Sequence, residues 1–511
     1  MSKRKKVICL IIDGWGLSPA GEFNAIDNAK TPNYDKLVRE YPNTRLKSDG
    51  LAVGLPEGQP GTSEVNHTII GAGRVILQEL PKINDHIATG TFFTNQILKD
   101  SIAKAEDNGG ALHLIGLLSD GGVHSLDKHL FALFKLVEES KFTNDVYLHL
   151  FTDGRDAPPK SAEKYLQRLD QEIQKFKNLK ISIATIQGRY FLDRDRDWDK
   201  SKTAVELIIN GNGKEASDWR AIINFEYNQN ITDEFFPQYV LNNQAKLQEN
   251  DSVIFFNYRT DRLYQLVSQM LTSAPKSVNF TTFVKVSDEF KTVNVAFPKE
   301  RIESTLAETV SKAGKKQLHI TETEKYAHLT FFLNGEREKE LSGEEWVMVE
   351  SNRYVKPFYN YEPSMRNFDI TKRIIQAIDA DEFDFIIANL PSPDMVGHTG
   401  NYHAAVISAE SIDYCLGRIY NAIKGRLDDY ALIITADHGN SDMMWDFENN
   451  QPHTQHTTAP VPFILVSNLN VKLDPRETLA DVAPTILDLM GIKKPAIMSG
   501  ESLLIQELSD S

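Results

Sequence analysis

The sequence predicts an α/β protein in which one domain is inserted into another. Short apolar runs of strand length alternate with segments of helical periodicity, which is typical of βαβ units around a parallel sheet. The length of 511 residues exceeds a usual single core, so two domains are expected. Candidate ligands for one site lie near both ends of the chain. We therefore place the outer domain at residues 1–76 and 312–511 and the inserted domain at residues 77–311.

The composition is that of an acidic protein with well-packed cores. Apolar residues make up 41% of the chain, and the net charge of −15 argues against a general binder of nucleic acid or membrane surfaces. Cys9 and Cys415 fall in a predicted strand and a predicted helix, which indicates core positions in a reducing compartment. The basic segment 3–6 precedes an apolar run that is too short for a signal peptide. We expect a cytoplasmic monomer.

The first segment predicts a strand over residues 7–12 that ends at Asp13. Thr31 and Pro32 open a helix, with Thr31 as N-cap and Pro32 at the first helical position. A loop rich in glycine and proline follows, and helical spacing begins after Ser63. Ser63 is either the N-cap of this helix or a nucleophile at its N-terminus, where backbone N–H groups favour anions.

The middle block predicts one recurring arrangement of strands and helices. Strands at 112–118, 146–151, 181–186 and 253–256 each end in polar or cationic residues, with helices at 126–138 and 161–176. Because the carboxyl ends of parallel strands share one edge, we expect these residues to line one cleft. Guanidinium groups bind phosphate and carboxylate, although any one of them could form a surface salt bridge instead. The arginines are Arg155, Arg189, Arg194, Arg259 and Arg262.

The last block resembles the first, because apolar strands again end near aspartates. Strands are predicted at 317–320, 383–389, 430–435 and 461–466, and helices at 369–378, 404–423 and 478–490. Aspartate or histidine follows two of these strands, and histidines lie in the loop before residue 461. One such Asp-His pair alone could be a helix cap and a surface histidine. Together the residues suit Mn²⁺, Zn²⁺ or Mg²⁺ better than Ca²⁺, and they suffice for two ions.

These residues predict phosphoryl transfer through a serine. Two divalent ions can clamp the attacking and leaving oxygens of a phosphoryl group. Ser63 would then act as the nucleophile and carry the phosphoryl group as phosphoserine. Lys325, which follows the strand at 317–320, would neutralise charge on the transferring group.

Eight motifs of the chain resemble those of the cofactor-independent phosphoglycerate mutases. They occur in order and cover nearly the whole chain, at residues 13–16, 61–74, 117–125, 153–156, 255–262, 323–328, 393–400 and 436–440. The resemblance implies an alkaline-phosphatase-like three-layer domain interrupted by a transferase domain. It also implies interconversion of 3-phosphoglycerate and 2-phosphoglycerate in glycolysis and gluconeogenesis, without 2,3-bisphosphoglycerate.

The resemblance further implies a role for each candidate residue. One metal would be bound by Asp394, His398 and His456, with His453 as the alternative to His456. The other would be bound by Asp13, Ser63, Asp437 and His438. Manganese is the usual metal of the family, with magnesium or cobalt in some members. Asp156 would be the acid/base on the glycerate hydroxyls, and the substrate contacts would be His124, Arg155, Asp156, Arg189, Arg194, Arg259, Arg262 and Lys325.

The chain departs from the family pattern at three places. The family usually has asparagine where Thr62 stands and glycine where Asn66 stands, so Asn66 either crowds the turn after the nucleophile or caps it. The family pattern runs one residue longer after Arg189, so either Arg194 or Arg196 takes the equivalent role. Residues 389–393 also differ from the more common Asn-Tyr-Ala-Asn-Pro.

Two rival functions fit parts of the sequence. A metal-dependent phosphatase or phosphodiesterase of the same superfamily would release its product to water, whereas the arginine-rich middle block favours retention of an organic acid. A non-catalytic sensor of metal or phosphate would not need Ser63 and Lys325. A coupled enolase assay with and without EDTA would separate these functions.

Overall fold

The computed structural model describes residues 4–475 and 478–506, and the chain forms two compact units. Unit 1 comprises the residues up to Gln78 and from Arg301 onward, and unit 2 comprises Glu79–Glu300. The second predicted boundary, at residues 311–312, falls inside helix α10 (Leu306–Lys312), which packs against unit 1 helices. The chain therefore passes back into unit 1 before α10.

Unit 1 is built on a seven-stranded sheet in the order β12-β11-β13-β1-β14-β17-β2. The first five strands in this order are parallel, whereas β17 is antiparallel to both of its neighbours. The strands predicted at 7–12, 317–320, 383–389, 430–435 and 461–466 are confirmed, and β2 and β12 are additional. The bounds are β1 (Lys6–Ile12), β2 (Asn43–Leu46), β11 (Gln317–Glu322), β12 (Glu344–Val349), β13 (Phe385–Leu390), β14 (Tyr430–Thr435) and β17 (Val461–Val466).

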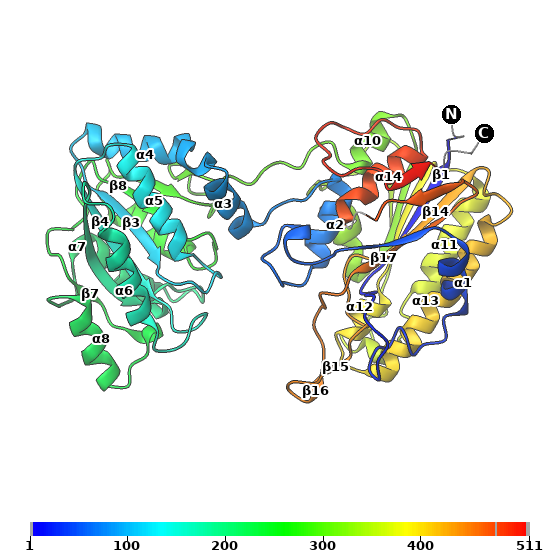
Figure 1. Ribbon diagram of the computed structural model, residues 1–511, viewed down its shortest axis with the longest axis horizontal. Coiled ribbons are helices and arrows are strands. Elements are labelled where there is room, and N and C mark those ends of the chain that lie inside the picture. The colour runs from blue at the N-terminus through cyan, green and yellow to red at the C-terminus, as the bar shows by residue number, and fades with distance from the viewer. Residues whose placement is uncertain (1–3, 476–477, 507–511) are drawn as a thin grey trace. The chain divides into compact units, whose positions relative to one another are not determined.

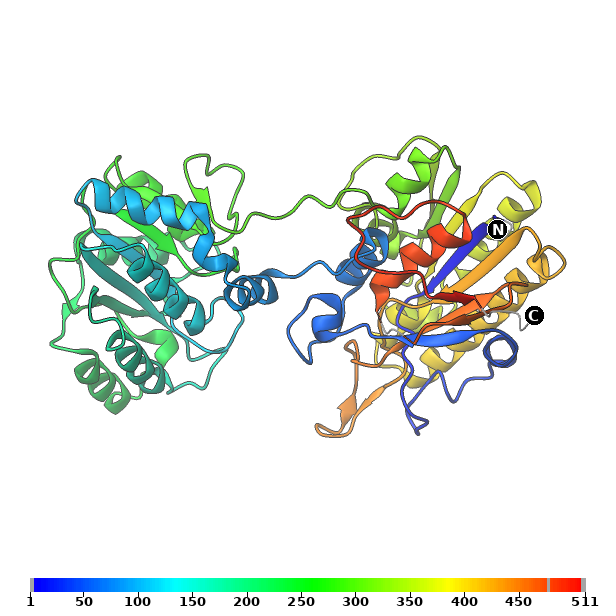
Figure 2. The same ribbon diagram turned by 45° about the horizontal axis from the view of Figure 1, so that its top comes forward.

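Helices cover both faces of this sheet, which confirms the predicted three layers (Figures 1 and 2). Helices α1 (Pro32–Glu40), α11 (Asn367–Ala380) and α13 (Tyr402–Ile423) pack together on one face. Helices α2 (Ser63–Ala72), α10 and α14 (Val482–Leu489) pack together on the other. Every residue of β14 is buried, as expected for a central strand with helices on both faces. Unit 1 also contains α12 (Ser392–Gly397), β15 (Trp445–Asp446), β16 (Gln451–Pro452), β18 (Val471–Leu473) and β19 (Leu504–Gln506).

Unit 2 contains a second sheet, in the order β10-β9-β8-β3-β4-β5-β7-β6. The strands from β10 to β5 in this order are parallel, and β7 is antiparallel to β5. Its strands are β3 (Leu112–Leu117), β4 (Asp145–Thr152), β5 (Lys180–Gly188), β6 (Lys214–Glu215), β7 (Tyr239–Val240), β8 (Ser252–Phe255), β9 (Asn279–Thr282) and β10 (Asn294–Val295). The four predicted strands of the middle block are β3, β4, β5 and β8, and they are adjacent.

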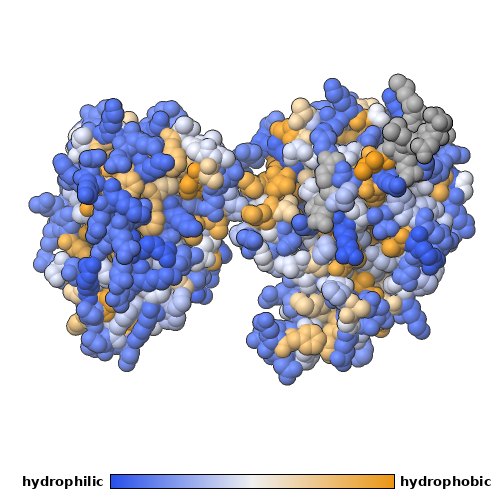
Figure 3. Space-filling view, in the orientation of Figure 1, coloured by the Kyte–Doolittle hydropathy of each residue, from blue (hydrophilic) through white to orange (hydrophobic). Residues whose placement is uncertain are grey.

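Two hydrophobic cores flank the sheet of unit 2. One core includes residues of helices α3 to α6 and α8, and the other includes residues of α7 and α9. The helices are α3 (Glu79–Ala88), α4 (Gln96–Asp107), α5 (Asp127–Glu139), α6 (Ala162–Ile173), α7 (Trp198–Asn210), α8 (Trp219–Asn228) and α9 (Tyr264–Ser273). On the face shown in Figure 3, hydrophilic residues cover most of each unit. No helix among the described residues has the length and apolar character needed to cross a membrane.

Candidate metal centre and anion pocket

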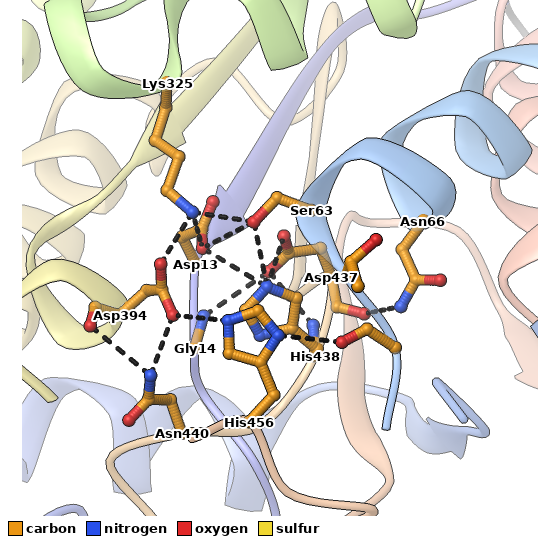
Figure 4. A network of polar contacts seen from close by, with 12 residues as sticks. Asp13, Gly14, Ser63, Asn66, Lys325, Asp394, Asp437, His438, Asn440 and His456 are labelled. Atoms are coloured by element: carbon orange, nitrogen blue, oxygen red, sulfur yellow. Dashed lines mark hydrogen bonds and ion pairs between the residues drawn. The ribbon is translucent and has the colours of Figure 1, made fainter. Parts of the chain in front are cut away.

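Ser63 is the first residue of α2, and its side chain is not used to cap the helix. The cap is Thr62, whose Oγ1 accepts a hydrogen bond from Val65 N at 3.3 Å. The N-cap interpretation of Ser63 is therefore wrong. Ser63 Oγ instead lies 2.6 Å from Lys325 Nζ and 2.9 Å from His438 Nε2 (Figure 4). The hydroxyl is thus directed into a polar cluster at the carboxyl edge of the sheet.

Asp394, His398 and His456 form one group of candidate metal ligands. Nε2 of each histidine lies 3.2 Å from Asp394 Oδ1, and the two Nε2 atoms lie 3.1 Å apart. His398 Nδ1 contacts Thr454 O, and His456 Nδ1 contacts Gly61 O, each at 2.8 Å. Because a carbonyl can only accept, Nδ1 carries the proton in both rings, which turns each Nε2 toward Asp394 and toward the other ring. Two imidazole Nε2 atoms and a carboxylate oxygen directed at one point are the kind of ligands that a divalent cation binds.

Asp13, Ser63, Asp437 and His438 form a second group. Asp13 follows β1 and Asp437 follows β14, and these strands are neighbours. His438 Nε2 lies 3.2 Å from Asp437 Oδ2 and 3.7 Å from Asp13 Oδ1. Asp437 Oδ2 is buried, and no residue that the structure describes donates a hydrogen bond to it. A buried carboxylate oxygen without a donor is costly, and a bound cation would remove that cost.

Gly14 allows Asp13 and Asp394 to lie close together. The chain turns at Gly14 with φ of +77°, and a Cβ atom there would lie 2.7 Å from Asp394 Cα. Any side chain would therefore be strained and would clash with the backbone of α12. This contact explains why glycine follows the aspartate in the first motif.

Lys325 connects the two groups of candidate ligands. Its Nζ donates to Asp13 Oδ1 at 2.7 Å, to Asp394 Oδ2 at 2.6 Å and to Ser63 Oγ at 2.6 Å. Burial alone would raise the pKa of Asp394, but Lys325 holds that pKa well below its usual range. Burial and the Asp13 carboxylate together raise the pKa of Asp437 far above normal. Three acidic groups crowded around one ammonium therefore resist full ionisation, and such a surplus of acidic groups fits the residues to divalent cations.

His67 and Asn389 are additional residues of the centre that sequence reasoning missed. Asn389 Nδ2 donates to Asp13 Oδ2 at 2.7 Å and lies 3.1 Å from His67 Nε2. His67 Nδ1 lies 2.9 Å from Ser63 O. His67, Asp13 and Asp437 also cluster closely enough to hold an ion. Because both nitrogens of His67 already have partners, we interpret it as a support for Ser63 and Asp13. In the sequence, the only signal of this role was the position of His67, one helical turn after Ser63.

The structure also separates the two candidate histidines of the 453–456 loop. His456 contacts Asp394, as described above. His453 has its backbone N bonded to Met444 O at 3.0 Å, and its Nδ1 is buried without a hydrogen-bond partner among the described residues. The geometry therefore brings His456, rather than His453, to the other ligands.

In unit 2, a cluster of arginines and carboxylates lies beyond the ends of β3, β4, β5 and β8. The buried Arg189 donates through Nη1 to Asp153 Oδ1 at 2.5 Å and to Asp156 Oδ2 at 2.6 Å. His124 lies between two carboxylates, 3.8 Å from Asp156 Oδ2 and 3.7 Å from Asp261 Oδ1. Burial and the charge of Arg189 lower the pKa of His124 to about 4. The histidine is therefore neutral near pH 7.

The remaining arginines belong to the same cluster. Arg194 Nη1 and Arg259 Nε contact Asp261 Oδ2 at 3.3 and 3.1 Å. Arg262 Nη1 donates to Leu192 O at 2.6 Å, and burial and Arg189 lower the Arg262 pKa. Arg155 is half exposed, with Nη1 3.5 Å from Glu234 Oε1. Such a concentration of guanidinium groups suits an anion with several negative oxygens.

Two further observations refine the predicted pocket. Arg194 shares Asp261 with Arg259, whereas Arg196 is placed with φ of +65° and its backbone N bonded to Gln265 Oε1. The geometry therefore brings Arg194 to the cluster. Asp153 and Asp261 were not predicted as site residues, although both lie inside the arginine motifs, and each orients guanidinium groups.

Comparisons with known proteins agree along the whole chain. Residues 5–494 match the Metalloenzyme superfamily. A 2,3-bisphosphoglycerate-independent phosphoglycerate mutase of Clostridium botulinum is 43% identical over 516 residues, which cover 99% of this chain and 100% of that protein. One from Acetivibrio thermocellus is 42% identical, with 99% and 100% covered. Among solved structures, Leishmania mexicana phosphoglycerate mutase at low cobalt concentration has a TM-score of 0.56 and 28% identity, covering 99% of this chain and 98% of that one.

Proposed function

The chain belongs to the Metalloenzyme superfamily and to the family of 2,3-bisphosphoglycerate-independent phosphoglycerate mutases, and from this premise we propose that it interconverts 3-phosphoglycerate and 2-phosphoglycerate through a phosphoserine on Ser63. The observation that carries the proposal is the position of Ser63 Oγ, within 2.9 Å of Lys325 Nζ and His438 Nε2. A buried hydroxyl between cationic and metal-binding groups can be deprotonated and can attack phosphorus.

The residues of unit 1 would hold two divalent cations. Asp394, His398 and His456 would bind one, and Asp13, Ser63, Asp437 and His438 the other. When bound, such ions favour the serine alkoxide and stabilise charge on a phosphoryl group. The mixed oxygen and nitrogen ligands suit Mn²⁺, with Mg²⁺ or Co²⁺ as alternatives. Lys325 would contact the transferring phosphoryl group, because its ammonium group already lies beside Ser63 Oγ.

The residues of unit 2 would retain the organic acid between the two transfers. Arg155, Arg189, Arg194, Arg259 and Arg262 supply the positive charge that a phosphoglycerate requires. Ser63 Oγ would attack phosphorus as the P–O bond to the glycerate breaks, and Asp156 would give a proton to the departing glycerate oxygen. The glycerate would then reorient, and its other hydroxyl would attack the phosphoserine. Asp156 would take the proton from that hydroxyl, with His124 beside it. The acid/base pair is therefore proposed on unit 2 and the nucleophile on unit 1.

A coupled enolase assay on the metal-stripped full chain tests the proposal. Activity should return with Mn²⁺, disappear with EDTA and be independent of added 2,3-bisphosphoglycerate. Parallel reconstitution with Mg²⁺, Zn²⁺ and Co²⁺ identifies the preferred metal. If inorganic phosphate were the main product, the chain would be a phosphatase, and the arginine pocket would have another purpose.

The same activity would place the protein in glycolysis and gluconeogenesis, in the cytoplasm. The acidic sequence, with a net charge of −15, is compatible with a monomer that binds no nucleic acid. Sedimentation of the Mn²⁺-loaded chain tests the monomer directly.

A further inference from the structure

Asn66 lies in the first turn of α2, close to Ser63, and is fully buried. Its Nδ2 donates to Asp437 O at 2.6 Å and to Ser48 O at 3.0 Å. Its backbone N donates to Thr62 O at 2.9 Å. One amide group therefore ties the turn that carries the nucleophile to the backbone of a candidate metal ligand, as Figure 4 shows beside the centre.

Both N–H donors of the Asn66 amide have hydrogen-bond partners, whereas, within the described part of the chain, its oxygen does not. Asn66 Oδ1 is buried and has no hydrogen-bond partner among the residues that the structure describes. An unpaired buried acceptor lowers stability, so the position is not optimised for folding alone. The two carbonyl groups it contacts would themselves lose a donor if Asn66 were replaced. Asn66 thus does not cap α2, since Thr62 does.

Gly61 connects Asn66 to the other group of candidate metal ligands. A Cβ atom on Gly61 would lie 2.3 Å from Asn66 Nδ2 and 2.1 Å from Ser48 O. Gly61 O is also the acceptor for His456 Nδ1, at 2.8 Å. The Asn66 amide therefore packs directly on the residue that fixes the ring orientation of His456.

We propose that Asn66 is a positioning residue that sets the placement of Asp437 relative to Ser63, and so the affinity of the metal site that these two residues share. The inference rests on the proposed function, because it takes Asp437 and Ser63 as ligands. Asn66 touches no reacting atom; it acts through a backbone carbonyl. Groups that orient metal ligands in this way commonly change metal affinity by about 10- to 100-fold when they are removed.

Calorimetric titration of Mn²⁺ into the metal-stripped full chain tests the inference without relying on activity. We expect two sites in the wild type, and in Asn66→Ala one of them should weaken by about tenfold or more. Asn334→Ala is the matched control. Asn334 is also buried in unit 1 and donates through Nδ2 to Glu344 Oε1 at 2.6 Å, and its Oδ1 has no hydrogen-bond partner within the described part of the chain. That variant should keep both Mn²⁺ affinities within about twofold while losing thermal stability in the metal-free state.

A kinetic measurement separates positioning from general damage. Asn66→Ala should lower kcat about tenfold at saturating Mn²⁺, with an unchanged KM for 3-phosphoglycerate, because the proposed substrate contacts lie mainly on unit 2. Wild-type Mn²⁺ affinities in Asn66→Ala would overturn the inference. If that variant does not fold, Asn66→Ser, which keeps one donor, should weaken one site less, and unchanged affinities there would overturn it equally. Absence of Mn²⁺ binding in the wild type would contradict the metal centre itself, and the inference with it.

Discussion

At the scale of single residues, Lys325 supplies the positive charge beside the carboxylates of the candidate metal centre in unit 1. Its ammonium group is shared by Asp13, Asp394 and Ser63, all within 2.7 Å. Burial disfavours a charged lysine, but the surrounding carboxylates raise the Lys325 pKa above its ordinary value. Lys325 therefore stays protonated and can stabilise negative charge, whereas it cannot act as the base for Ser63.

Replacing Ser63 by alanine should abolish mutase activity while only weakening metal binding. The hydroxyl would be lost as nucleophile, but Asp13, Asp437 and His438 would still offer ligands. We expect turnover to fall by at least about a thousandfold, in line with the loss of a nucleophile in other enzymes. The enolase-coupled assay measures turnover, and calorimetry measures Mn²⁺ binding. Near-normal turnover of Ser63→Ala would refute the nucleophile assignment.

Glu322, at the end of β11, gives a prediction for the pH dependence of stability. Burial raises its pKa from 4.5 to about 7. The folded protein then holds a proton that the unfolded chain has released, so the free energy of unfolding falls as pH rises from 4.5 to 7. The pKa change corresponds to about 3 kcal/mol. Glu322→Gln should be more stable than the wild type at pH 8 by up to this amount, and of similar stability at pH 4.5.

Glu324 serves as the neighbouring control for this prediction. Although burial opposes it, the nearby hydroxyl of Tyr359 and the ion pair with Lys356, at 2.9 Å, lower the Glu324 pKa. Glu324→Gln should therefore lose stability at pH 8, the opposite sign to Glu322→Gln. Urea unfolding of both variants at pH 5 and pH 8 measures the effect. Equal stability changes at the two pH values would contradict the pKa assignment of Glu322.

At the scale of elements, the positions of the strands were predicted more accurately than the directions in which they run. Each central strand is a run of apolar residues, which is why β1, β13 and β14 could be recognised from sequence. The apolar run of β17 looks the same, yet β17 is antiparallel to β14. Apolar periodicity indicates that a strand is buried, but it does not indicate whether the strand runs parallel or antiparallel to its neighbours. The edge strands β2 and β12 were missed because they are only partly buried and their patterns are mixed.

The contact between α2 and the π-helical turn η6 (His328–Phe332) gives a prediction at this scale. A Cβ atom on Gly71 of α2 would lie 1.8 Å from Leu333 O, directly after η6. Gly71→Ala should therefore push α2 from this turn and separate Ser63 from Lys325. We expect a stability loss of about 1–3 kcal/mol, despite the roughly 1 kcal/mol gain in helix propensity, and at least about tenfold lower kcat.

Gly425→Ala is the control for Gly71→Ala. Apart from its chain neighbours, no described residue has an atom within 4 Å of a Cβ built at Gly425, and its φ is not positive. This variant should keep wild-type stability within about 0.5 kcal/mol, as exposed substitutions generally do. Thermal unfolding and the coupled assay measure both variants. If Gly71→Ala were as active and stable as Gly425→Ala, the contact would not position Ser63.

At the scale of the whole molecule, the two units differ in the charged residues of their candidate sites. The carboxylates and histidines of the metal centre belong to unit 1, and the arginine cluster belongs to unit 2. The chain passes between the units twice, because unit 2 is inserted between α2 and α10. Each unit has its own hydrophobic core, so the two should respond separately to ligands.

Calorimetric scanning should show this separation. Under the proposed function, Mn²⁺ would bind only the folded form of unit 1, so it should raise the transition of unit 1 and leave that of unit 2 unchanged. At a free concentration of about 1,000 times Kd the stabilisation is about 4 kcal/mol. Asp13→Asn, which removes one charged ligand, should reduce the shift. An equal shift of both transitions would show that the units unfold together, and no shift would contradict the metal centre.

The sequence by itself determined the local elements and the polar residues at their ends. Asp13, Asp437 and Lys325 could be predicted to meet because parallel strands place their carboxyl ends at one edge. The arginines of unit 2 could be predicted to cluster for the same reason. This reasoning needs only local periodicity and one geometric rule.

Only the tertiary structure decided how each side chain is oriented. Gly61 O fixes the ring of His456, although the two residues are 395 positions apart. The choice of His456 over His453, the support from His67, the amide contacts of Asn66 and the role of Asp261 depend on such pairings. Hydrogen bonds between distant segments leave no periodic trace in a single sequence, so their geometry appears only when the chain is folded.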